Sequence, residues 1–222
     1  MALKPRKQEG TGTTQPLIVA GTYPIRVAQI IDLGVQKQRP YQGKEKPPVQ
    51  EVMLTYEFLD EFCVDEDGNE DEAKPRWLSE TMPLYSLKAD KAKSTNRYLA
   101  IDPQLEFDED FTMLAGGAAN ATIVHNAGKG ANVGKTYMNI QSLSAMRPKD
   151  VANAPDLKNP TKVFVLDEPD LEVFSSLPEW IQDKIKGNLE YQGSVLQKAL
   201  EGPQSGSDEP QSGDDLNDDE GW

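Results

Sequence analysis

Alternating hydrophobic and polar positions predict that the chain between residues 17 and 143 consists mainly of β-strands. The pattern is clearest where Val52, Leu54 and Tyr56 occupy every second position, so that they share one face of a strand. Comparable patterns predict five strands, at residues 22–33, 51–62, 76–84, 120–126 and 136–143. The dipeptide Asp67-Gly68 predicts a tight turn, which would join the second and third strands as a long hairpin.

One helix interrupts this series, because residues 88–101 have helical spacing and a basic face. Three strands, a helix and two more strands within about 125 residues is the element order of the OB-fold, a five-stranded Greek-key barrel. Other small barrels share the strand count, and the inserted helix favours the OB-fold over them. We therefore predict a mainly β, OB-fold nucleic-acid-binding domain over residues 17–146.

Three segments flank this predicted barrel. Residues 1–16 are polar and basic, which predicts a flexible arm. Residues 147–200 predict a C-terminal extension with a helix at about 176–190, where Ser176 begins a capping box. This helix would pack either on the barrel or on a second subunit, which leaves a homodimer open. Gly, Pro, Ser, Asp and Glu dominate residues 201–222, so we expect a disordered acidic tail.

The formal net charge of −14 argues at first against a nucleic-acid partner. The acidic residues are nevertheless concentrated in two segments, 57–72 and 201–222, and neither segment contains Lys or Arg. They hold nine and eight acidic residues, so the rest of the chain has a net charge of +3. Basic surfaces can therefore exist on an acidic protein.

Three basic segments also carry tyrosines. The candidate DNA contacts are Arg39, Tyr41, Lys44 and Lys46 before the second strand, Lys91, Lys93 and Arg97 on the helix, and Lys129, Lys135 and Tyr137 before and in the fifth strand. Single-stranded DNA binding needs cations for phosphates and aromatic rings for bases. In an OB-fold the first and third segments would frame the binding groove. The alternative is that they are ordinary solvated loops, with Tyr137 in the core.

The sequence offers little for catalysis or metal binding. The single cysteine, Cys63, and the single histidine, His125, cannot supply a Cys/His zinc site or a recognisable triad. Residues 128–136 lack a glycine that a P-loop requires, and a strand pattern follows them. Residues 65–76 lack the glycine and glutamate of a calcium loop. We therefore expect no enzyme activity, cofactor or metal.

The tail combines carboxylates with a tryptophan, which solubility alone does not require. The aromatic ring suits a pocket and the anions suit a basic rim, so the pattern predicts a partner-docking peptide formed by Asp218, Asp219, Glu220 and Trp222. The same charge could compete with DNA for the groove. An alternative function is that of an acidic interaction protein or nucleic-acid mimic, which would bind a basic protein.

Several stretches resemble bacteriophage single-stranded DNA-binding proteins of the OB-fold, acidic-tail type. They are Gly-Thr-Tyr-Pro-Ile-Arg-Val at 21–27, the stretch from Asp32 to Gly43, and Leu-Thr-Tyr-Glu-Phe-Leu-Asp-Glu-Phe at 54–62. The resemblance implies a role in phage DNA replication or recombination and tail contacts with replication proteins such as polymerase, helicase or primase. No run of 18 apolar residues is present, so we expect no membrane partner and a location in the host cytoplasm.

Overall fold

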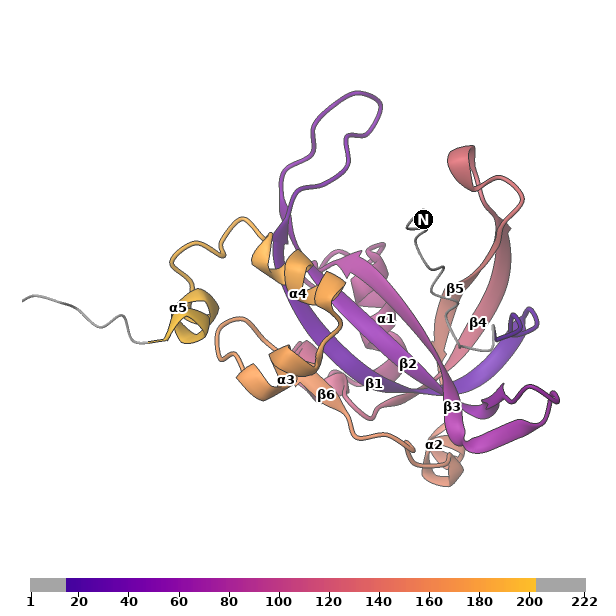
Figure 1. Ribbon diagram of the computed structural model, residues 1–222. Coiled ribbons are helices and arrows are strands. Elements are labelled where there is room, and N and C mark those ends of the chain that lie inside the picture. Colours follow the sequence, from indigo (N-terminus) through magenta and orange to yellow (C-terminus); the bar gives the residue numbers. More distant parts are fainter. Residues whose placement is uncertain (1–14, 203–222) are drawn as a thin grey trace, which may run out of the picture.

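A six-stranded sheet organises the computed structural model, which describes residues 15–202 (Figure 1). The strands are β1 (Gly21–Gln36), β2 (Val49–Val64), β3 (Glu70–Pro83), β4 (Ala118–Ala127), β5 (Thr136–Ala145) and β6 (Lys162–Phe164). The helices are α1 (Lys93–Ile101), α2 (Pro148–Asn153), α3 (Leu171–Ser176), α4 (Glu179–Lys186) and α5 (Val195–Glu201), with short 3₁₀ turns η1 (Phe111–Leu114) and η2 (Gly130–Asn132). The prediction of a mainly β protein is confirmed.

The hydrogen-bonded strand order is β3-β2-β1-β4-β5, and each of these neighbours is antiparallel. One edge of β1 pairs with β4 over residues 21–26 and then in parallel with β6 over residues 29–31. Gly34 lies beside a register shift with a φ of +72°. A side chain there would collide with Asn188, since an added Cβ would lie 2.6 Å from its Cγ.

The five predicted strands lie where the sequence places them, with shifted ends. The main difference is β3, which begins at Glu70 because its hairpin with β2 continues to the pair Val64 and Glu70. The helix predicted at 88–101 is shorter, since α1 begins at Lys93 and turns precede it. The predicted arm and tail lie outside the described residues, apart from residues 15–16 and 201–202.

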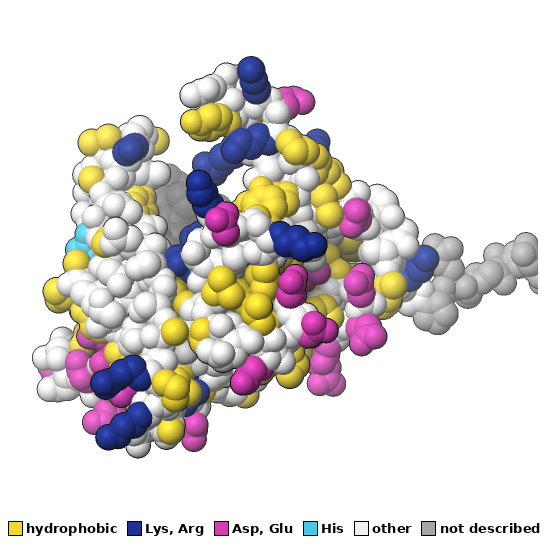
Figure 2. Space-filling model, turned by 180° about the vertical axis from the view of Figure 1, so that it is seen from behind, with side chains coloured by type: hydrophobic (Ala, Val, Ile, Leu, Met, Phe, Trp, Pro, Cys, Tyr) yellow, Lys and Arg dark blue, Asp and Glu magenta, His cyan; other side chains and the backbone are white. Residues whose placement is uncertain are grey.

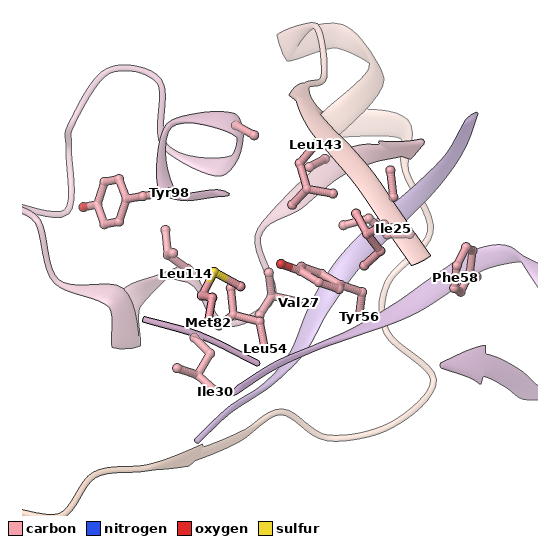
Figure 3. Packing of buried hydrophobic residues seen from close by; sticks show 14 of the residues in the cluster. Ile25, Val27, Ile30, Leu54, Tyr56, Phe58, Met82, Tyr98, Leu114 and Leu143 are labelled. Carbon is pink, nitrogen blue, oxygen red and sulfur yellow. The ribbon is translucent and has the colours of Figure 1, made fainter. Parts of the chain in front are cut away.

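The main core lies on the face of the sheet that α1 covers (Figure 3). Alternate residues of β2, namely Leu54, Tyr56 and Phe58, point into it together with Ile25 and Val27 of β1. All five are essentially inaccessible to solvent. Because each such side chain contributes about 1.5–3 kcal/mol on burial, this alternation fixes which face of the sheet is inside.

A second core forms on the opposite face of β1 and β2. Ile31, Leu33 and Met53 pack there against apolar residues of the C-terminal extension. The partners are Phe164, Phe174, Leu177, Ile181, Ile185 and Leu196. The extension therefore braces the outside of the sheet of its own chain.

The helix predicted at about 176–190 is present as the shorter α4, but the capping box predicted at Ser176 is wrong. Ser176 ends α3 rather than capping a helix, and α4 runs only from Glu179 to Lys186. Pro178 explains the break, since its ring disfavours helical backbone at Leu177, which has φ −75° and ψ 147°. Gly187 then ends α4.

Two polar anchors, Arg26 and the buried Glu57, fix the connection from the sheet to the extension. Arg26 donates hydrogen bonds to the carbonyl oxygens of Gly116, Ala154 and Pro155. Glu57, which is 0% exposed, accepts hydrogen bonds from the Trp77 indole (2.9 Å), the Lys158 backbone N–H (2.6 Å) and the Asn159 amide (2.8 Å). Three donors satisfy a carboxylate that would otherwise be costly to bury. No helix among residues 15–202 is long and apolar enough to cross a bilayer.

Candidate nucleic-acid interface

Two loops project from the same end of the molecule (Figure 1), and the space-filling view shows a hollow between them (Figure 2). We name residues 37–48 the β1–β2 loop and residues 128–135 the β4–β5 loop. Figure 2 shows Lys and Arg side chains on both projections. The exposed cations are Lys37, Arg39, Lys44 and Lys46 on the first loop and Lys129 and Lys135 on the second. The structure thus brings together two of the three basic segments.

The tip of the β1–β2 loop is a two-residue hairpin turn. Tyr41 and Lys44 exchange backbone hydrogen bonds of 2.9 and 3.0 Å, and the two residues between them have positive φ. Gly43 suits this geometry, which is that of a type I′ turn. The turn presents the Tyr41 ring, which is 61% exposed, and Lys46 Nζ lies 5.0 Å from its centroid. An exposed ring beside cations can stack on a base while the cations meet phosphates.

The β4–β5 loop is closed by a hydrogen bond of 2.8 Å from Gly128 N–H to the Lys135 carbonyl. Tyr137 follows the loop and is exposed, so it does not lie in the core. Met138, the next residue, packs against the main core. Because successive side chains of a strand point to opposite faces, Tyr137 lies on the face of β5 away from the main core. Lys129 is thus part of the β4–β5 loop, whereas Tyr137 belongs to strand β5.

The three candidate cations of the helix segment differ in their exposure and in their ion pairing. Lys91 is exposed, and Lys93 Nζ lies 2.6 Å from the Glu80 carboxylate. Arg97 is only 3% exposed, with its Nε 2.6 Å from Glu80 Oε1 and its Nη2 3.2 Å from the carbonyl oxygen of Ile140. We therefore remove Arg97 from the candidate DNA contacts.

The position of Arg97 has a clear physical reason. No hydrogen-bonded pairing joins β3 to β5 in the described sheet, so both are edge strands. Arg97 bridges them, because it binds Glu80 of β3 and a carbonyl of β5. Tyr56 also donates to Glu80, at 2.9 Å. Burial raises the pKa of Glu80, but hydrogen bonds and charges from Arg97 and Lys93 outweigh it and leave that pKa lowered.

Two tryptophans that sequence reasoning left out lie at a groove on the outer face of the sheet. Trp77 of β3 is 37% exposed and Trp180 of α4 is 60% exposed. The groove, which we name the tryptophan groove, has a volume of about 320 Å³. Its other lining residues include Met53, Lys162, Leu177 and Ile181. A signal existed for Trp180, since it lies off the Leu177, Ile181 and Ile185 stripe and so faces solvent.

The segment from Gln15 to Ile18 contacts β2 at one end and β4 and β5 at the other. The Gln15 side chain exchanges hydrogen bonds with the Val64 backbone, at 2.9 and 2.8 Å. Ile18 is buried, and its carbonyl oxygen lies 2.7 Å from Nε2 of His125. Its backbone N–H donates to Met138 Sδ at 3.0 Å. His125 therefore serves to fasten this segment to β4.

Within residues 15–202, no three His, Cys, Asp or Glu side chains gather in a way that could hold a metal ion. Comparison with known proteins adds no relative: no protein-family model matches the chain, and no curated sequence is detectably similar. The partner-docking residues Asp218, Asp219, Glu220 and Trp222 lie outside the described residues.

Proposed function

We propose that this protein binds single-stranded DNA without sequence preference and protects it during phage DNA replication or recombination, with no catalytic activity. The observation that carries the proposal is the hollow between two loops that each bear exposed cations, with the exposed Tyr41 on one of them (Figure 2). Cations follow a phosphate backbone and a ring stacks on any base, so this combination favours binding that tolerates all sequences.

The strand order supports an OB-fold for this domain. An OB-fold is a partly open Greek-key barrel that binds oligonucleotides with its β1–β2 and β4–β5 loops and the face of its second and third strands. The order β3-β2-β1-β4-β5 fits such a barrel opened between β3 and β5, and α1 lies between β3 and β4 in sequence. The two cation-bearing loops are then the two that this fold uses for nucleic acids.

The charges of the two loops predict how steeply DNA affinity should fall with salt concentration. Six exposed Lys and Arg side chains lie on the two loops. Each phosphate contact with a single strand contributes about −0.7 to the slope of log affinity against log salt, so six contacts give about −4. A steep slope would distinguish phosphate binding from the binding of an uncharged ligand.

The acidic tail would then have two roles. Its eight carboxylates in residues 201–222 would compete with DNA for the loop cations, and Asp218, Asp219, Glu220 and Trp222 would dock a replication protein such as polymerase, helicase or primase. In the alternative, an acidic interaction protein, the acidic residues would form the main binding surface. Loss of the loop cations would then leave its function unchanged.

Fluorescence anisotropy with a labelled oligothymidylate at low and high salt tests the proposal. Tyr41→Ala should weaken binding by about 1–3 kcal/mol, the value of one stacked base, whereas Tyr41→Phe should not. Lys44→Gln should weaken binding and reduce the salt slope. Lys74→Gln is the matched control, since Lys74 is exposed but pairs with Asp71 on the acidic hairpin. No binding at low salt, or equal effects of Lys44→Gln and Lys74→Gln, would overturn the proposal.

A further inference from the structure

The tryptophan groove is an exposed apolar site that the DNA-binding proposal does not use. Trp77 and Trp180 contribute their rings from β3 and α4, and Met53, Leu177 and Ile181 contribute aliphatic surface. Large apolar side chains gathered at a groove on a protein surface commonly mark a binding site. Two tryptophans at one groove favour an aromatic ligand, since aromatic rings attract one another in stacked or edge-to-face pairs.

The groove also has a cation at its margin. Lys162 of β6 lines it, and Lys162 Nζ lies 3.0 Å from the hydroxyl oxygen of Ser176, which lines it too. The Ser79 and Thr55 side chains on the groove's wall hydrogen-bond to each other at 2.8 Å. A ligand with an aromatic ring followed or preceded by carboxylates would therefore match both parts of the site.

We propose that the tryptophan groove binds Trp222 of the same chain, with the neighbouring acidic residues directed toward Lys162. Trp222 follows Asp218, Asp219 and Glu220 closely in sequence, which is the aromatic and acidic combination that the groove fits. The chain has only three tryptophans, and this arrangement would bring all of them together. The aromatic residue of the tail would then be stored on the C-terminal extension and withheld from a partner protein.

The chain can reach the groove without difficulty. Leu196 of α5 packs in the same core as Leu177 and Ile181, which line the groove. Residues 203–222 follow α5 after Gly202, and 20 residues can span about 65 Å when extended. Neighbouring packed helices lie only about 8–10 Å apart. Tethering also gives the tail an effective concentration of about millimolar, so even weak intrinsic affinity would keep the groove occupied.

Fluorine NMR of the full chain labelled with 5-fluorotryptophan, without DNA, tests this proposal. The three signals can be assigned with Trp→Phe variants. We expect the Trp222 signal to differ from that of a free peptide with the sequence of residues 203–222, and Trp222→Ala to shift the Trp180 signal. Trp180→Ala should return the Trp222 signal to the free-peptide position, and Lys162→Gln should move it part of the way.

The controls separate docking from damage to the fold. Val195→Ala changes an exposed residue of α5 that does not line the groove, so it should leave the Trp222 signal unchanged. Circular dichroism should show that Trp180→Ala keeps its thermal midpoint, since that side chain is largely exposed. A Trp222 signal that coincides with the free peptide, and a Trp180 signal unmoved by Trp222→Ala, would overturn the proposal.

Two other outcomes would also overturn it. A Trp222 shift that grows with protein concentration would place the tail on a second copy instead of its own chain. A Trp180 signal that ignores Trp222→Ala but moves on addition of an oligonucleotide would assign the groove to nucleobases. Because the main measurement contains no DNA, its failure would leave the loop-mediated DNA binding untouched, and failure of DNA binding would leave the docking result standing.

Discussion

Replacing Arg97 by Ala should destabilise the protein strongly without weakening DNA binding. The Glu80 carboxylate would keep Lys93 as a cationic partner, but it would lose two hydrogen bonds from Arg97, and the carbonyl of Ile140 would lose its donor. Breaking a buried ion pair from one side costs about 3–5 kcal/mol. The remaining Lys93 places this case near the lower end, at about 3 kcal/mol.

Urea unfolding followed by circular dichroism measures this loss. With a slope of about 2 kcal/mol/M, a loss of 3 kcal/mol lowers the urea midpoint by about 1.5 M. Lys93→Gln is the matched control on the same carboxylate. The Lys93 side chain is 45% exposed, so its pair should contribute only about 0–1 kcal/mol and the midpoint should move little.

Oligonucleotide affinity, measured below the unfolding transition, separates the structural role from the role in DNA binding. Arg97→Ala should bind DNA within twofold of the unchanged protein, because the side chain is buried behind Glu80. An Arg97→Ala protein with an unchanged urea midpoint and tenfold weaker DNA binding would refute this reasoning. The helix segment would then contact DNA, as the sequence alone predicts.

Three further predictions concern acid stability, the second loop and the buried anchor. The pKa of Glu80 is lowered in the folded protein, so its contribution to stability is present above its unfolded pKa and is lost as pH falls through the folded pKa. The urea midpoints of the unchanged protein and of Glu80→Gln should therefore converge between pH 7 and 3. Changing both Lys129 and Lys135 to Gln should reduce the salt slope of DNA binding by about 1.4, and an unchanged slope would exclude that loop from phosphate contact. Glu57→Ala leaves three donors unsatisfied and should lower the free energy of unfolding by about 3 kcal/mol or more, seen as earlier proteolysis near residues 154–159; equal protease resistance would contradict the anchor.

The strands of the sheet were predictable because burial on one face imposes a period of two. Leu54, Tyr56 and Phe58 show this period in sequence and lie together in the main core. The two projecting loops were predictable for a related reason: Pro, Gly and Lys between strands leave no apolar face to bury. The basic β1–β2 loop, with Tyr41 at its tip, therefore matches the sequence pattern.

The burial of Arg97 could not be predicted from charge, since a basic residue on a helix usually faces solvent. It depends on the pairing of α1 with two strand edges that come from distant parts of the sequence. The periodicity of α1 did carry a signal, because Ser94, Arg97 and Tyr98 share one buried face. Strand β6 was beyond local reasoning as well, since three residues become a strand only when β1 offers a free edge.

The segment at residues 15–18 has a consequence for synthesis on the ribosome. Its hydrogen bonds join positions 49, 60, 107 and 120 residues apart, the last between Ile18 and Met138. At about 5–20 residues per second, the partner in β5 emerges about 6–24 seconds after Ile18. During that interval the apolar side chain of Ile18 has no native site and is available to a chaperone. The first described segment of the chain to be made is thus among the last that can reach its native contacts.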